Sequence, residues 1–459
     1  MRKTFLMLFV AAAPLLAQQP GHLAADIDKA ATEILAKAGT PSASLAVVRD
    51  GKIIYEHAYG KAKLDPASAA TTAMRYSIGS ISKQFTSAAI LLLAEEGKLS
   101  LDDKVGRWLP DVTRAGDVTI RQLLSMTSGY QDFWPQDYVM PTMLRDVEPT
   151  EIANGWAKKP LDFEPGAKWQ YSNTNYVIAG MIVEQVSGMS LFDFLTKRIF
   201  EPLQMTTVSN TDQAALPATD AMRYLRYATG PVHAAPKEGR GWMFGAGELA
   251  MTPHDLALWD ISMIDQTVLK PATYGDLETE VQLNSGVGTR YGLGVEVSTR
   301  DTRRLIAHSG EVSGFTAANH VYPDERVAVC VFTNLDATPA SEQIASRIDK
   351  LLFEATDKDT TAALAEVRSI YASLQKGKID RSLFTSNANA YFSEQALRDF
   401  ASSLGKLGKP TDFSQSSQSL RGGMTLRRYT LKYPKQTLRL TTFWLPDRKL
   451  EQYIVAAAE

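Results

Sequence analysis

Cysteine is almost absent from this sequence, which contains only Cys330 among its 459 residues. One thiol can form neither an internal disulfide nor a cysteine-based zinc site, and the apolar neighbours of Cys330 indicate a thiol buried in a core. The six histidines are scattered, without a His-Glu-x-x-His pattern, so we expect no metal centre, and no cofactor of another kind. A chain of this length can be held together by its hydrophobic core alone.

Long blocks of one charge and long hydrophobic runs are also lacking. The net charge of -2 and the mixed charges argue against binding to nucleic acid or to an anionic membrane surface. Residues 5–16 are apolar, follow Arg2 and Lys3, and precede Ala17. This run is shorter than the roughly 20 residues of a membrane-spanning helix and is typical of a signal peptide, residues 1–17. We expect an exported protein, periplasmic or secreted, without stable membrane insertion after cleavage; an uncleaved anchor is the alternative.

The segment that follows begins like a β-hairpin. Residues 42–48 and 53–59 are strand-like runs, and the Asp50-Gly51 pair between them is a strong hairpin signal because both turn positions need positive φ. Residues 80–96 then form a helical pattern that is apolar almost all the way round. Such a helix is usually buried at the centre of a domain.

Strands return only after a long helical region. The pattern from about 100 to 270 is mostly helical with Pro and Gly breaks, strand-like runs follow at 305–307 and 327–332, and a last helix is expected over 341–354. Strands at both ends with helices between them predict one α/β domain, whose sheet is closed by distant parts of the chain.

The remaining residues predict a second, smaller domain. Residues 355–362 have the composition of a linker. Beyond it, helical patterns near 363–376 and 394–406 precede strands such as 437–444, so residues 363–459 are expected to form a small α+β domain. The two-residue period of that last strand places four side chains on one face: Leu438, Leu440, Thr442 and Trp444.

Ser80 and Lys83, at the start of the predicted buried helix, combine a nucleophile with a base. Their spacing of three places both side chains on the same helical face. A free lysine has a pKa of about 10.4, but burial and the positive end of the helix dipole both disfavour the ammonium form. Lys83 can therefore accept the proton of Ser80, and the helix start supplies a backbone N–H for an oxyanion.

This spacing is not specific by itself, because Ser373-Leu-Gln-Lys376 repeats it. The second copy lies at a helix end, before Gly377, where the dipole has the wrong sign to neutralise a lysine. We interpret it as solvated surface. Other hydrolase signatures are missing from the sequence, which has neither a Gly-x-Ser-x-Gly elbow nor a glycine-rich phosphate loop.

Two further motifs strengthen the hypothesis of a catalytic serine. In Tyr171-Ser-Asn173, a tyrosine can relay a proton, and an asparagine amide can hold a substrate carbonyl while donating to the lysine. A turn with a packed aromatic is the alternative interpretation. His308-Ser309-Gly310 ends an apolar strand, where glycine lets a substrate backbone lie against the strand edge. A lone histidine is otherwise most often a satisfied core or surface group.

The three motifs, in this order and spacing, resemble those of the penicillin-recognising serine hydrolases, and in particular the class C β-lactamase and DD-carboxypeptidase branch. The resemblance covers about residues 25–354. It extends to other family signatures, at residues 76–86, 101–105, 118–124, 127–129, 163–166, 199–203 and 291–294. The implied fold is β-lactamase/transpeptidase-like: an antiparallel sheet flanked by helices, plus a helical subdomain.

The resemblance also implies a two-step acyl transfer. Ser80 would attack a carbonyl while Lys83 and Tyr171 shuttle its proton. The oxygen of the tetrahedral intermediate would be held by the backbone N–H groups of Ser80 and Glu311, and water would then release the acyl group.

On the substrate side, the resemblance implies that Asn173 orients the substrate amide or ester, and that His308, Ser309 and Gly310 line the opposite wall. Family β-lactamases usually have Lys-Thr-Gly where this chain has His308-Ser-Gly. A mostly neutral imidazole offers a hydrogen bond rather than a fixed charge to the carboxylate of a β-lactam. Histidine there is typical of DD-carboxypeptidases, D-amino-acid peptidases and esterases of the family. Met126 also departs from the family, where many relatives have histidine.

We therefore expect an exported serine hydrolase that acts on a peptide, of the D-amino-acid or DD-carboxypeptidase type, or on a carboxylic ester. Its substrate would be a small molecule or a peptide, with peptidoglycan-derived peptides among the candidates. A true β-lactamase and a non-catalytic penicillin-recognising or cell-wall-binding module are the alternatives. The C-terminal domain weakly resembles cystatin-like or NTF2-like accessory folds, and it could gate the site, bind a partner or stabilise the protein.

Overall fold

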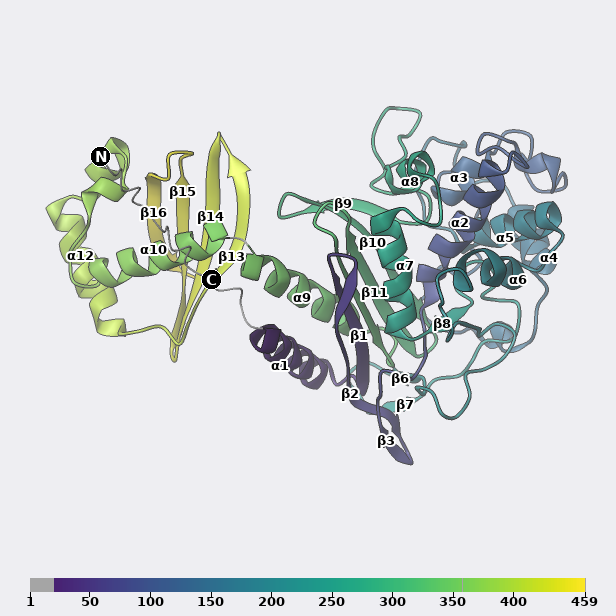
Figure 1. The fold of residues 1–459 in the computed structure, drawn as a ribbon, viewed down its shortest axis with the longest axis horizontal. Coiled ribbons are helices and arrows are strands. Elements are labelled where there is room, and N and C mark those ends of the chain that lie inside the picture. Colours follow the sequence, from purple (N-terminus) through teal and green to yellow (C-terminus); the bar gives the residue numbers. More distant parts are fainter. Residues whose placement is uncertain (1–19, 357, 459) are drawn as a thin grey trace, which may run out of the picture.

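The structure is a computed structural model that describes residues 20–356 and 358–458. Figure 1 shows two parts, a larger one built on a seven-stranded sheet and a smaller one with a four-stranded sheet at the C-terminal end. The expected signal peptide, residues 1–17, lies outside the described residues. Among those described, no single helix is long and apolar enough to cross a membrane; one pair, Asn173–Ser187 and Leu191–Phe200, meets that criterion only jointly and is bent by 72°.

The larger part begins with helix α1 (Pro20–Ala38) and the expected hairpin. Strands β1 (Ser42–Arg49) and β2 (Lys52–Leu64) pair antiparallel. Asp50 and Gly51 between them have φ of 54° and 71°, the left-handed conformation that such a tight turn requires. The hairpin prediction is confirmed.

The seven-stranded sheet joins segments from both ends of this part. Its order is β3-β2-β1-β12-β11-β10-β9, and all neighbouring strands run antiparallel. Ala43 of β1 lies opposite Thr333 of β12, so distant parts of the chain close the sheet as predicted. The other strands of this sheet are β3 (Ala67–Ala69), β9 (Glu296–Arg300), β10 (Arg303–Val312), β11 (Phe315–Tyr322) and β12 (Val327–Thr333).

Helices cover both faces of this sheet (Figure 1). Helices α1 and α9 (Ala340–Thr356) pack on one face, and α7 (Pro253–Asp265) packs on the other. Successive residues of β1 alternate between the two cores, because side chains of a strand point to opposite faces. Burial on both faces explains why the strand reads as a continuous apolar run rather than as an alternating one.

Beyond α7 lies a helical region centred on α2 (Ser82–Glu95) and α5 (Asn173–Ser187). Every residue of α2 from Ser82 to Leu93 is buried, which confirms the prediction of a central buried helix. The remaining helices of the larger part are η1 (Gly79–Ile81), η2 (Val105–Arg107), α3 (Ile120–Leu124), η3 (Pro141–Leu144), α4 (Pro149–Ile152), η4 (Ala153–Ala157), α6 (Leu191–Leu195), η5 (Thr196–Phe200) and α8 (Pro271–Glu278). Its short strands are β4 (Tyr76–Ser77), β5 (Ser209–Asn210), β6 (Tyr224–Arg226), β7 (Val232–Ala234) and β8 (Leu249–Met251).

The smaller part has an antiparallel sheet in the order β13-β14-β15-β16 and a core of its own. The strands are β13 (Asp412–Arg421), β14 (Met424–Tyr433), β15 (Gln436–Trp444) and β16 (Leu450–Ala457), and the helices are α10 (Lys358–Leu374), η6 (Arg381–Leu383), α11 (Ser386–Tyr391), α12 (Glu394–Leu404) and η7 (Gly405–Leu407). The four residues expected on one face of the strand near 437–444 are all buried. The mixed α/β class, with a small α+β part after it, is thus confirmed.

The expected linker, residues 355–362, joins the two parts and has a helical conformation where the structure describes it. The described residues of 355–362 are helical, because α9 continues to Thr356 and α10 begins at Lys358. Polar residues occur both in loops and at helix ends, so composition alone did not distinguish a loop from two adjoining helices.

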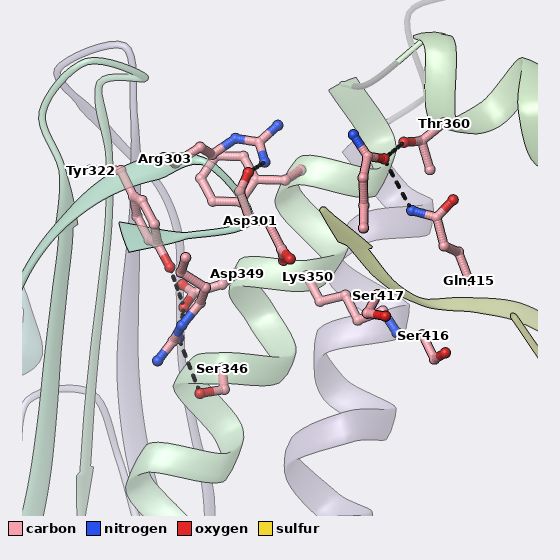
Figure 2. Close-up of a pocket in the computed structure, with 13 residues that line it drawn as sticks. Asp301, Arg303, Tyr322, Ser346, Asp349, Lys350, Thr360, Gln415, Ser416 and Ser417 are labelled. Atoms are coloured by element: carbon pink, nitrogen blue, oxygen red, sulfur yellow. Dashed lines mark hydrogen bonds and ion pairs between the residues drawn. The ribbon is translucent and has the colours of Figure 1, made fainter. Parts of the chain in front are cut away.

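A small polar cavity of about 160 Å³ lies where the two parts meet (Figure 2). Asp349 and Lys350 of α9 line it from one side, and Gln415 and Ser416 of β13 from the other. Asp349 is engaged by Arg300, whose Nη1 donates to its Oδ2 at 2.6 Å. We interpret this cavity as part of the contact between the two parts.

Candidate active site

Ser80 lies in the short turn η1, which leads directly into α2, and β10 passes close beside that turn. Two glycines permit the approach. A Cβ atom on Gly79, which has φ of 50°, would lie 2.8 Å from Glu311 N, and one on Gly310 would lie 1.9 Å from Ile78 O. Any side chain at either position would push the turn and the strand apart.

Lys83 is fully buried and points at Ser80. Its Nζ donates to Ser80 Oγ at 2.9 Å, to Asn173 Oδ1 at 2.8 Å and to Ala246 O at 2.7 Å. Desolvation lowers the pKa of Lys83 to about 7, against the opposing effect of the Asp132 carboxylate. A large share of the lysine is therefore neutral near pH 7, and a neutral amine can accept the serine proton.

Tyr171 lies next to both Lys83 and Ser80. Lys83 Nζ is 5.0 Å from the centre of its ring, and its hydroxyl forms a hydrogen bond with Ser80. Desolvation raises the pKa of Tyr171 well above its usual value, although the hydrogen bond with Ser80 lowers it. The phenol thus keeps its proton at neutral pH, which suits a relay and not a phenolate base.

Asn173, the first residue of α5, is brought to Lys83 as expected, but with the opposite hydrogen bond. We expected its amide to donate to the lysine; instead its Oδ1 accepts from Lys83 Nζ. The reason is Asp132, whose Oδ2 accepts from Asn173 Nδ2 at 3.2 Å and so holds the NH₂ group away from the lysine. The Nδ2 also lies 3.5 Å from Trp134 O.

His308 of β10 is buried and held in a single tautomer. Its Nδ1 donates to Ser309 O at 2.6 Å, and its Nε2 accepts from the Tyr291 hydroxyl at 2.9 Å. Burial, together with the charge of Lys83, lowers the pKa of His308 to about 4. The imidazole is therefore neutral at physiological pH, as expected from the sequence.

The rest of the third motif divides between two roles. Ser309 and Glu311 are exposed and line the cavity in front of Ser80. Gly310 packs against the η1 turn, so its lack of a side chain lets the strand approach the turn; the substrate contact expected of Gly310 is still a prediction. The ladder between β9 and β10 ends at Ala307, which leaves residues 308–312 without a strand partner on that side within the described chain. The free edge is available to an extended substrate.

The backbone N–H groups of Ser80 and Glu311 lie on segments that face each other. A Cβ on Gly79 would lie 2.8 Å from Glu311 N, and one on Gly310 would lie 3.4 Å from Ser80 N. These are the two groups that we expected to hold an oxyanion. That role is still a prediction.

The cavity that contains Ser80 has a volume of about 640 Å³ and is strongly acidic. Five carboxylates line it: Asp132, Asp137, Glu296, Glu311 and Asp336. Neither lysine nor arginine is among its lining residues in the described chain. Partial desolvation of the Glu311 carboxylate raises its pKa, and the negative charges of Asp137 and Asp336 add to the effect. Sequence reasoning missed the acidic lining: Glu311 was named only for its backbone N–H, and Asp132 had a nearby signal, since it follows the Thr127-Ser-Gly129 signature.

Met126, the other departure from the family pattern, contacts the segment that carries the Tyr171-Ser-Asn173 motif. It is buried with φ of 63°. Its sulfur accepts from Ser172 N at 3.4 Å and from Asn175 Nδ2 at 3.6 Å. The thioether thus acts as a weak acceptor that anchors the segment carrying Tyr171 and Asn173.

Comparisons with known proteins agree with this geometry. A family model described as Beta-lactamase matches residues 27–352. The chain is 30% identical over 328 residues to penicillin-binding protein 4* of Bacillus subtilis (strain 168), covering 66% of this chain and 70% of that protein. Among solved structures, a D-stereospecific amidohydrolase from Streptomyces sp. is 27% identical with a TM-score of 0.62, covering 73% of this chain and 99% of that one. The octameric penicillin-binding protein homologue from Pyrococcus abyssi is 20% identical, which shows the fold alone, with a TM-score of 0.64 over 95% of this chain and 96% of that one.

Proposed function

The chain belongs to the beta-lactamase family of serine hydrolases, and from this premise we propose that it is an exported hydrolase that acts through an acyl-Ser80 intermediate on a peptide, an amide or a carboxylic ester. The observation that carries the proposal is the 2.9 Å contact between Ser80 Oγ and the Nζ of the fully buried Lys83. A serine alone is a weak nucleophile, and an adjacent base whose pKa lies near 7 activates it.

In the proposed reaction, Ser80 Oγ attacks the carbonyl carbon and passes its proton to Lys83 Nζ. The carbonyl oxygen becomes an oxyanion, stabilised by the N–H groups of Ser80 and Glu311. The bond to the leaving group then breaks, and the leaving group takes the proton from Lys83 through the Tyr171 hydroxyl. Water attacks the acyl-serine by the same route in reverse, which releases the acid and restores Ser80.

The charge of the cavity supports amide or ester substrates over β-lactams. A β-lactam carries a carboxylate near the scissile bond, and so does a peptide cut by a carboxypeptidase. The five lining carboxylates would repel that group, and the neutral His308 offers no opposing charge. The same field would attract a free ammonium group, which D-amino-acid amides carry. The similarity to a D-stereospecific amidohydrolase supports this choice.

The proposal is tested with the purified protein, a fluorophosphonate probe and three substrates: p-nitrophenyl acetate, a D-amino-acid p-nitroanilide and nitrocefin. We expect Ser80→Ala to abolish labelling and hydrolysis. The matched control is Ser373→Ala, which alters the serine of the other Ser-x-x-Lys and should change neither. A wild type that is neither labelled nor active would favour the non-catalytic binding module, and nitrocefin turnover faster than that of the anilide would favour a true β-lactamase.

Export and partners are part of the same proposal. The layout of residues 1–17 supports cleavage after Ala17. An exported enzyme of this family would meet peptides derived from peptidoglycan, and the acidic cavity would favour those without a carboxylate next to the scissile bond. N-terminal sequencing of the protein recovered outside the cytoplasm should begin at Gln18. Recovery of the intact leader on a membrane fraction would instead favour the uncleaved anchor.

A further inference from the structure

Asp132 contacts Asn173, which hydrogen-bonds to Lys83, but Asp132 does not contact Ser80 or Lys83 directly. It lies three residues beyond Gly129, in the loop that borders the cavity, and is mostly buried. Its Oδ1 accepts from the backbone N of Asn173 at 3.0 Å and from that of Trp134 at 3.1 Å. Its Oδ2 accepts from Asn173 Nδ2 at 3.2 Å.

The contact with Asn173 N caps a helix from a distant loop. Ser172, the residue before α5, makes no capping hydrogen bond with its own side chain. Asp132 supplies an acceptor in its place, and a negative charge at this end is favoured by the helix dipole. Taken alone, this contact would give Asp132 a structural role only.

The second contact goes further, because it determines which end of the Asn173 amide faces the lysine. An amide has one accepting and one donating end. With Nδ2 bound to Asp132 Oδ2, the Oδ1 end is directed at Lys83 Nζ, 2.8 Å away. A continuous chain of hydrogen bonds thus runs from the carboxylate through the amide and the amine to Ser80 Oγ.

On the premise of the proposed function, we propose that Asp132 is a positioning residue that orients the Asn173 amide and, through its negative charge, sets the pH at which Lys83 becomes a base. Among the residues that the structure describes, the other groups that face Lys83 carry no negative charge near neutral pH. They are the phenols of Tyr171 and Tyr176, with ring centres at 5.0 and 5.6 Å from Nζ, and the imidazole of His308. Asp132 is the carboxylate whose charge acts on the pKa of Lys83, and it raises that pKa.

The sign of the effect follows from the charges. Removing the carboxylate destabilises the ammonium form of Lys83, so the amine loses its proton at a lower pH. The test is the second-order rate of Ser80 labelling by a fluorophosphonate between pH 5 and 9, since this reaction needs acylation only. In the acid limb of this pH profile, the labelling rate falls as Lys83 becomes protonated. For Asp132→Asn we expect the acid limb to move to lower pH by about one unit, because the charge acts across an intervening amide. The plateau should fall by less than about tenfold, because a weaker base removes the proton less readily.

The controls separate this role from capping. Asp102→Asn removes an exposed carboxylate elsewhere in the same part of the chain and should leave the acid limb unmoved. Asp132→Glu keeps the charge and should hold the limb near its wild-type position. Should Asp132→Asn fail to fold, Asp132→Ser carries the same test, since a hydroxyl is a neutral cap.

Two results would contradict the inference. An unmoved acid limb in Asp132→Asn, with or without a lower Tm, would leave Asp132 as a helix cap and overturn the inference alone. A wild type that is not labelled at Ser80 at any pH would overturn the proposed function, and this inference with it.

Discussion

The burial of Lys83 makes a thermodynamic prediction that does not depend on the substrate. Replacing Lys83 with methionine, which has a similar length and no charge, removes the titrating group. In the wild type the folded protein holds Lys83 with a pKa of about 7, whereas the unfolded chain has the ordinary value of 10.5. Between these two pH values the unfolded state binds one proton more than the folded state.

Stability rises with pH wherever the unfolded state binds more protons, by about 1.4 kcal/mol per pH unit for one proton. The lysine therefore destabilises the fold fully below pH 7, and this cost disappears as the pH rises toward 10.5. We expect the free energy of unfolding of the wild type, minus that of Lys83→Met, to rise by about 3 kcal/mol between pH 8 and 10. The broken hydrogen bonds to Ala246 and Asn173 shift the whole difference curve but leave its slope intact.

The measurement is urea unfolding of both proteins at several pH values, followed by tryptophan fluorescence. Six of the seven tryptophans precede α9 and report on the part that contains the site, whereas Trp444 lies in the smaller part. The exposed Lys197, replaced by methionine, is the matched control and should give a flat difference. A flat difference for Lys83→Met would refute the argument, because it would mean that Lys83 stays protonated in the fold.

Two other predictions address the glycine contact and a second buried cation. Gly310→Ala places a Cβ 1.9 Å from Ile78 O, so it should slow Ser80 labelling more than tenfold and cost about 1–3 kcal/mol of stability, seen as a lower Tm; normal labelling would contradict the close packing of η1 on β10. Burial alone would lower the pKa of His320, but Asp349 and Glu342 outweigh it and raise the pKa to about 9. The stabilisation that protonated His320 gives to the fold is fully present below about pH 6.5 and is lost as the pH rises to 9. The stability of the wild type minus that of His320→Gln should therefore fall by up to about 1.4 kcal/mol per pH unit in that window. A difference in stability that rises or stays flat over this pH window would refute the raised pKa of His320.

Much of the fold was predictable because local signals agreed with the tertiary structure. The Asp50-Gly51 pair favours a left-handed turn in any context. The helix after Ser80 is apolar on all sides because other parts of the protein surround it. The sheet order was predictable only in outline. The pairing of Ala43 with Thr333 depends on two segments 290 residues apart, and no local period encodes their register. The helical conformation of the described residues in 355–362 was not predictable from composition, because polar residues occur both in loops and at helix ends.

The candidate site was predictable as far as its residues follow recognisable motifs. Ser80, Lys83, Tyr171, Asn173 and His308 lie together, although their catalytic and binding roles are still untested. A sequence motif does not show which other segments of the chain occupy the space around it.

Two residues illustrate this. The strand pattern does not show that the η1 turn of the same chain occupies the space where a side chain at Gly310 would be. The hydrogen-bond direction of Asn173 was wrong, because it depends on Asp132, 41 residues earlier in the sequence.

Asp132 is separated from Lys83 by one residue, Asn173, and this position explains how a basic amine can lie beside an acidic cavity. A carboxylate in direct contact with Lys83 would form an ion pair and keep the ammonium protonated, which would remove the base. With the Asn173 amide between them, the carboxylate acts on the lysine only through a neutral group. Desolvation then remains the larger effect, and the pKa of Lys83 settles near 7. The amide thus lets the cavity keep a negative field for a cationic substrate without protonating the group that must activate Ser80.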